Sequence, residues 1–274
     1  INFINTQHGL TGKHKGGQRD TSYFPKMLVH RFDEIAKANT NPTLVMESKT
    51  NLVDAKVYQP TQDGGEHIYA TIGLTAMGGG GKGLVGYRIY ADQSAEVDDW
   101  VSKNKPNGSP KETSIYHKVT PLFEITNEGP KELRTDGFED LGYTYSGFEF
   151  FNRIIEQSNI FGGKTKLKGQ AVAIFGNGFG SDSGKSVLYF IDAYTGKKLH
   201  EIVLDSQGLG AGTPSIIVAP GMNGGQELKR IYVGDYSGSL YKIEFNGYDF
   251  ENNARITTLF KVPPTNYGQF AISV

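Results

Sequence analysis

The sequence of 274 residues contains no cysteine and a single tryptophan, Trp100. Without cysteine the chain can form no disulfide, no thiolate zinc site, no thiol nucleophile and no covalent haem attachment. Lys and Arg number 28 against 29 Asp and Glu, so no excess of positive charge favours a nucleic-acid surface. Mean hydropathy is -0.40, which is too polar for an integral membrane protein built from helices. Partners must therefore be recognised by local features.

The beginning of the sequence, Ile1–Asn5, has neither an initiator methionine nor the basic and apolar regions of a signal peptide. We therefore expect a mature product or a piece of a longer protein, with the targeting signals outside it.

Turn-forming residues are frequent, with 36 glycines and 11 prolines. A helical pattern follows Pro25, and Asn39 to Pro42 would end it. Its apolar residues fall on one face at a spacing of three to four: Met27, Leu28, Phe32, Ile35 and Ala36. After it, β-branched and aromatic runs between glycines indicate strands. We expect an N-terminal segment (1–50) with one helix that packs on a β domain (51–274).

Three stretches of the β region resemble one another. Each consists of a strand, a glycine-containing tip and a second strand, at residues 68–89, 171–192 and 230–243. Candidate strands precede these hairpins at 52–58, 145–151 and 213–219, and others follow at 120–125, 198–204 and 257–262. Each unit therefore has about four strands.

A repeated four-stranded meander is the pattern of a propeller blade, because one blade alone cannot bury both of its faces. The leading strands start farther apart than the ~40–50 residues of a regular blade, which predicts insertions at 92–118 and 154–170. A closed ring needs roughly 4–8 blades. A fourth unit would begin at Gln269, and the sequence does not decide whether the chain holds a whole ring or only part of one. The prediction is an all-β, insertion-rich β-propeller with a short N-terminal helix, and a sandwich or open stack of sheets is the alternative.

Several segments, taken in their order along the sequence, resemble those of a known family. They are Phe175-Gly176-Asn177-Gly178-Phe179, Asp192-Ala193-Tyr194-Thr195-Gly196-Lys197, Val233-Gly234-Asp235-Tyr236-Ser237-Gly238, and the glycine tip at 78–83. Their order and approximate spacing over residues 50–274 resemble the C-terminal β-propeller of PilC/PilY-type proteins, the adhesins associated with the tips of bacterial type IV pili.

The resemblance implies a non-enzymatic protein that is exported to the bacterial cell surface, outer membrane or pilus tip. It would support pilus biogenesis and host-cell adhesion, with pilins or minor pilins and a host-cell receptor as partners. Neither a nucleic acid nor a small-molecule substrate is expected.

Propellers of this family often carry a calcium loop before the Val-Gly-Asp strand. In the matching stretch, 219–229, the carboxylate positions fall on Gly221, Gly225 and Lys229, which leaves Asn223 and Glu227 as candidate ligands. Calcium takes 6–8 oxygen ligands, and its affinity depends on their charge. The sequence therefore favours a plain glycine turn over a calcium site, and no cofactor is firmly implied.

The segment 192–197 also looks like the strand-ending turn of quinoprotein dehydrogenases. Such a turn is structural: aspartate and threonine oxygens accept hydrogen bonds from turn amides, and glycine supplies a positive φ. A quinoprotein (PQQ) dehydrogenase-like propeller is one alternative function, and a periplasmic assembly scaffold without an adhesion role is the other. The 16 Phe and 15 Tyr residues either fill the space between blades or form a contact surface.

Overall fold

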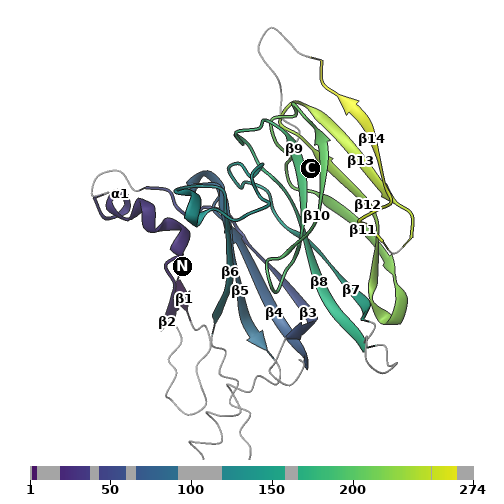
Figure 1. Cartoon of the computed structure of the whole chain (residues 1–274), viewed down its shortest axis with the longest axis horizontal. Helices are drawn as coiled ribbons and strands as arrows, with labels where there is room; N and C mark the ends of the chain where they lie inside the picture. The colour runs from purple at the N-terminus through teal and green to yellow at the C-terminus, as the bar shows by residue number, and fades with distance from the viewer. Residues whose placement is uncertain are drawn as a thin grey trace, which may run out of the picture.

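The computed structural model describes residues 2–4, 19–37, 43–59, 66–91, 119–157, 166–247 and 249–263. Three four-stranded antiparallel sheets follow one another along the chain and fan out side by side (Figure 1). The first sheet contains β3 (Thr50–Gln59), β4 (Glu66–Ala76), β5 (Gly83–Ala91) and β6 (Thr120–Thr126). The second contains β7 (Glu149–Gln157), β8 (Lys166–Gly176), β9 (Ser186–Asp192) and β10 (Lys198–Asp205). The third contains β11 (Ser215–Pro220), β12 (Gln226–Gly234), β13 (Ser239–Phe245) and β14 (Ala254–Lys261).

In each sheet the strands pair in chain order, so every unit is a four-stranded meander, as predicted. The first strands of the units come together on one side, where β7 contacts both β3 and β11. This is the arrangement of propeller blades. A separate short pair, β1 (Asn2–Ile4) and β2 (Arg19–Ser22), precedes the sheets.

The predicted position of β7 is wrong. Residues 145–148 lie outside the strand. Within the expected insertion, residues 154–157 belong to β7 and residues 166–170 to β8, and Gln157 pairs with Lys166. The sequence did not predict this pairing because the end of β7 and the start of β8 are rich in polar residues, and hydrophobic alternation is the main signal of a strand. Residues 158–165, the predicted insertion at 92–118 and Gln269 lie outside the described residues.

The predicted helix is confirmed, but its single apolar face is not. Its first part is the 3₁₀ helix η1 (Lys26–Arg31), and α1 (Phe32–Lys37) follows. Met27 and Leu28 are buried, whereas Phe32 is 57% exposed, because a 3₁₀ turn has three residues and rotates later residues away from the face. Residues 38–42 are not described. Neither helix here has the length and apolar character that a membrane crossing requires.

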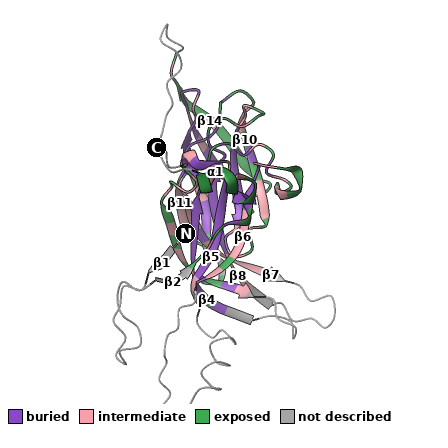
Figure 2. Ribbon diagram, turned by 90° about the vertical axis from the view of Figure 1, so that its left-hand side faces the viewer, coloured by how far each residue is buried: buried purple, intermediate pink, exposed green. Residues whose placement is uncertain are grey.

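The middle strands of the second sheet, β8 and β9, bury side chains on both faces. Buried residues fill the centre of the molecule in Figure 2. Side chains of β8 alternate between two cores: Ala173 and Phe175 pack with the first sheet, whereas Val172 and Ile174 pack with the third. All four are at most 1% exposed. At ~25 cal/mol per Å² of buried apolar surface, this burial is the main force that holds the sheets together.

The other face of the first sheet is covered in part by the N-terminal segment. Met27 and Leu28 pack against Tyr87 in a third apolar cluster. Glu124 on β6 fastens this segment, because its carboxylate accepts hydrogen bonds from the backbone N–H of Lys26 (2.8 Å) and Met27 (2.7 Å). Hydrogen bonds from two backbone N–H groups to a carboxylate are strong and offset the free-energy cost of removing it from water.

The connector between the first two sheets, residues 127–148, bonds to all three sheets or their connections. Its Thr144 hydroxyl donates to the Gly83 carbonyl (2.7 Å) in the first sheet. Its Gly147 amide donates to the Thr213 hydroxyl (2.8 Å), directly before β11. The C-terminal part of the connector is therefore fixed to the first sheet and to the segment before β11.

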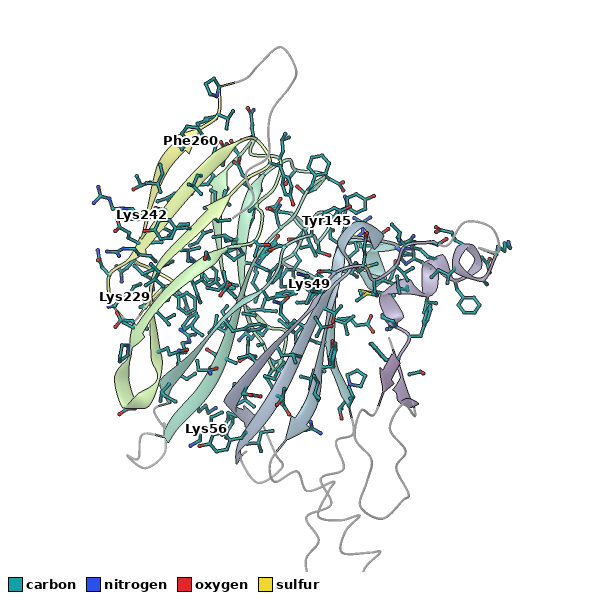
Figure 3. The ribbon with its side chains drawn as sticks, turned by 180° about the vertical axis from the view of Figure 1, so that it is seen from behind. Lys49, Lys56, Tyr145, Lys229, Lys242 and Phe260 are labelled. Carbon is teal, nitrogen blue, oxygen red and sulfur yellow. The ribbon has the colours of Figure 1, made fainter. Side chains whose placement is uncertain are left out.

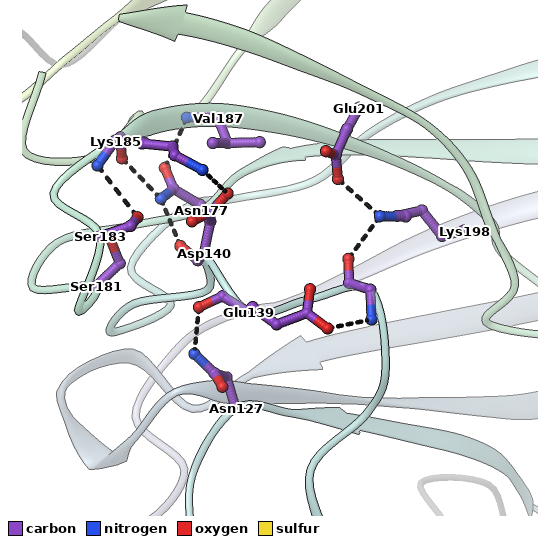
Figure 4. A network of polar contacts seen from close by, with 11 residues as sticks. Asn127, Glu139, Asp140, Asn177, Ser181, Ser183, Lys185, Val187, Lys198 and Glu201 are labelled. Carbon is purple, nitrogen blue, oxygen red and sulfur yellow. Dashed lines mark hydrogen bonds and ion pairs between the residues drawn. The ribbon is translucent and has the colours of Figure 1, made fainter. Parts of the chain in front are cut away.

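Asn177 joins this connector to the loops of the second and third sheets. Figure 4 shows its contacts with Asp140, Lys185 and Val187. The side chain is fully buried and uses its entire hydrogen-bonding capacity. Its amide nitrogen donates to the carbonyls of Asp140 (2.7 Å) and Lys185 (2.9 Å), and its oxygen accepts from the amides of Val187 (3.0 Å) and Ala211 (2.8 Å). One residue thereby fixes three loops.

Replacement Asn177→Ala should lower the free energy of unfolding by about 2–4 kcal/mol, because buried backbone groups lose their partner. Chemical denaturation monitored by far-UV circular dichroism measures this loss. The exposed Asn253→Ala serves as the control and should stay within about 0.5 kcal/mol of the wild type. An Asn177 variant as stable as this control would contradict the role assigned to the side chain.

A candidate interaction site at the hairpin end

The tips of the β4–β5, β8–β9 and β12–β13 hairpins lie at the same end of the fan as the connectors 127–148 and 206–214, and we call this the hairpin end (Figure 1). Backbone hydrogen bonds join these loops across the sheets. Gly178 donates to Ala211 (3.0 Å), and Tyr236 donates to Gly210 (3.0 Å). The loops therefore form one connected surface.

Four aromatic residues at this end, Tyr143, Tyr145, Phe179 and Tyr236, form what we call the aromatic patch. Exposed fractions are 39% for Tyr143, 54% for Tyr145 and 47% for Phe179. The Phe179 and Tyr236 rings meet edge to face with centroids 5.5 Å apart. The backbones of Tyr143 and Phe179 exchange hydrogen bonds of 2.7 and 3.2 Å. Burial, with a smaller contribution from Tyr145, raises the pKa of Tyr236. The Tyr236 hydroxyl therefore stays uncharged at neutral pH.

Leu209 adds an apolar side chain beside these loops. It is 39% exposed, and its φ of 63° is unusual for a residue with a branched side chain. Its amide donates to the Gly184 carbonyl (2.9 Å), which holds this conformation. Strained residues of this kind concentrate at functional sites.

Charges of both signs surround the patch. Lys82 and Asp182 form an ion pair of 2.9 Å, which lowers the pKa of the Asp182 carboxyl. Glu47 accepts a hydrogen bond from the Gly79 amide (3.2 Å). A Cβ on Gly79 would lie within 2.7 Å of both the Glu47 carboxylate and the Tyr145 hydroxyl, so these groups flank the same glycine (Tyr145 is labelled in Figure 3). An apolar centre with a polar rim is typical of a protein interface.

Asp235 of the Val-Gly-Asp motif has a structural role. Its buried carboxylate accepts hydrogen bonds from the Ser237 amide (3.0 Å), the Ser239 amide (2.8 Å) and the Tyr241 hydroxyl (2.9 Å). Burial raises the pKa of Tyr241, and the hydrogen bond to Asp235 adds to the effect. Because the chain's own donors occupy this carboxylate, it shapes the β12–β13 tip.

The structural interpretation of the turn at 192–197 is confirmed. Asp192 accepts hydrogen bonds from the amides of Tyr194 (3.0 Å) and Thr195 (2.9 Å), and Gly196 has a φ of 73°. The second carboxylate oxygen accepts from the Gln170 side chain (2.8 Å). The turn closes the β9–β10 hairpin with its own groups.

The two candidate calcium ligands lie in the β11–β12 turn, in different surroundings. Asn223 is exposed at the tip, in the 3₁₀ turn η4 (Met222–Gly224), whereas Glu227 is 7% exposed and pairs with Lys229. Within the described ranges, no three His, Asp or Glu side chains lie close enough together to share a metal ion.

Glycine at two of the family's carboxylate positions has a packing reason. A Cβ on Gly225 would lie 2.8 Å from the Ile154 backbone nitrogen, and one on Gly221 would lie 2.9 Å from the Gln226 backbone carbon. The turn therefore packs closely against β7 and closes through the Gly221 amide, which donates to the Gly225 carbonyl (2.8 Å). A carboxylate could enter either position only if the backbone moved.

The sequence did not predict the aromatic patch. Phe175 and Phe179 belong to the same glycine-flanked segment, yet they are 1% and 47% exposed. Phe175 lies in strand β8, between two sheets, whereas Phe179 lies in the hairpin tip beyond the end of the strand. The only sequence signal is that the patch residues stand next to glycines or in connectors.

Comparisons with known proteins identify the fold. No protein-family model matches the chain, and no curated protein matches it significantly. Among solved structures, the chain is similar to the crystal structure of the Pseudomonas aeruginosa PilY1 C-terminal domain, with a TM-score of 0.54 and 16% sequence identity. The match covers 100% of this chain and 48% of that one, so this chain spans about half of the solved domain. At this identity the likeness shows the fold, and the propeller-like architecture predicted from the repeated meanders is that of the PilY1 C-terminal domain.

Proposed function

We propose that this chain is a propeller module of a type IV pilus-associated cell-surface protein. In this proposal it supports pilus biogenesis and host-cell adhesion through protein contacts at the hairpin end. Pilins or minor pilins and a host-cell receptor are its partners, and the bacterial surface, outer membrane or pilus tip is its location. The likeness of the fold to the PilY1 C-terminal domain supports the pilus context.

The observation that carries the proposal is the aromatic patch on bonded loops. Large aromatic side chains that are 39–54% exposed at one end of a rigid scaffold are typical of protein contact sites. Because backbone hydrogen bonds already fix these loops, a partner would not need to order them on binding, which reduces the entropic cost of association.

A scaffold role without catalysis agrees with the surroundings of the motif aspartates. The carboxylates of Asp192 and Asp235 are both occupied by donors from the chain. A carboxylate held in this way shapes a turn and has little capacity left for a substrate.

The double replacement Tyr145→Ser and Phe179→Ser tests the proposal. We expect the isolated chain to lose less than about 1 kcal/mol of stability, because both side chains are exposed. In a bacterium that makes the full protein, surface pili or attached host cells should fall about tenfold or more, since aromatic hot spots contribute ~2 kcal/mol or more each.

The control is Tyr69→Ser, which removes a 59% exposed ring on β4, far from the hairpin end. Pili are counted by electron microscopy, and attachment is scored separately. Loss of pili assigns the patch to assembly, and loss of attachment with normal pili assigns it to adhesion. Normal values for both would exclude the patch as the contact site.

We also propose that the β11–β12 turn works without calcium. Thermal unfolding in a chelator and in millimolar calcium should then give the same midpoint within about 1 °C, because a ligand that binds the folded form alone raises stability. The same melt with pyrroloquinoline quinone added should be unchanged. A calcium-dependent rise that Glu227→Gln removes would show that the turn is a metal site.

A further inference from the structure

Each sheet has one outer edge strand, namely β6, β10 and β14, which has a partner strand on one side only among the described residues. Such a strand presents unpaired backbone N–H and C=O groups, which can pair with another chain unless the edge is protected. The three edges differ in this protection.

Two of the edges carry protective features. Strand β6 contains Pro121, which has no N–H, and the N-terminal segment is bonded to its Glu124. Strand β10 has two register irregularities, between Lys198 and His200 and between Val203 and Asp205. Proline, covering segments and bulges are the usual means of blocking edge pairing.

In the part of the chain that the structure describes, strand β14 lacks most of this protection. It contains no proline, pairs with β13 over its whole length with one irregularity, and seven of its eight residues are exposed. Its large apolar side chains are exposed too: Ile256 (40%), Leu259 (47%) and Phe260 (54%). Phe260 stands at the outer margin of the third sheet in Figure 3.

The charges on β14 indicate what it would accept. The strand carries Arg255 and Lys261 and no acidic residue. The sheet face beside it adds Arg230 and Lys242, and both of these pair with the single carboxylate of Glu244. Opposite charges across a strand pair stabilise it, and like charges destabilise it.

From this edge and its charges, we propose that β14 binds an extended segment of a partner protein as a fifth strand. The segment has acidic residues near both ends and apolar residues between them. Backbone hydrogen bonds give the affinity, and contacts with Phe260 and the basic side chains give the specificity. A second copy of this chain fits poorly, because two β14 strands side by side would bring four basic residues together with no acid. This inference is independent of the hairpin end.

Two labelled nine-residue peptides serve as probes, both with alternating Val and Thr. One has aspartate at each end and the other has lysine. Fluorescence anisotropy should show that the aspartate peptide binds with a Kd below about 1 mM and at least tenfold more tightly than the lysine peptide. Hydrogen exchange of the amides of Ala254–Lys261 should slow in the complex.

The double variant Arg255→Glu and Lys261→Glu should reverse the preference, a gain of binding that an unfolded variant could not show. The control, Lys131→Glu with Lys197→Glu, makes the same change in net charge at exposed positions elsewhere and should leave the preference unchanged. The proposal is overturned if neither peptide binds, if both bind equally, or if protection from exchange appears elsewhere. It is also overturned if sedimentation shows a dimer of this chain formed through β14.

Discussion

A four-stranded sheet with two apolar faces is stable in water only when both faces are covered, and this constraint organises the whole chain. The second sheet meets it most fully, because β8 sends alternate side chains into two cores. The first sheet covers part of its other face with Met27 and Leu28 of the N-terminal segment. Non-directional burial brings the sheets together but does not fix how their loops lie.

Directional hydrogen bonds fix how the loops lie relative to the sheets. Asn177 and the connector residue Thr144 join loops of different sheets through buried groups with defined geometry. Buried networks in which every polar group is satisfied rigidify a structure. Exposed aromatic side chains at the hairpin end therefore stand on a fixed base, as a recognition surface requires.

The sequence predicted most strands because their apolar runs end at glycines. It placed β7 too early, since Tyr145 and Phe148 suggested a strand where the chain instead crosses between sheets. The structural role of the turn at Asp192 was also readable, because a turn is a local feature. The role of Asn177 was not, because its partners, Asp140 and Ala211, are 37 and 34 residues away in the chain.

The exposure of the aromatic patch could not be predicted from the sequence either. Tyr189 is 1% exposed and Tyr145 is 54% exposed, although both fall in runs that the sequence predicted as strands. Exposure depends on which sheet lies opposite, and this is settled only when the sheets stack.

Native-state hydrogen exchange tests most directly whether the sheets and the hairpin-end loops form a single rigid unit. The amides to compare are those of Gly142, Val187 and Ala211, which bond to the backbone or side chain of Asn177. If the loops open only with the sheets, these amides exchange as slowly as those in the middle of β8 and β9. Exchange as fast as at freely exposed amides would contradict a rigid hairpin end and show that its loops move independently of the sheets.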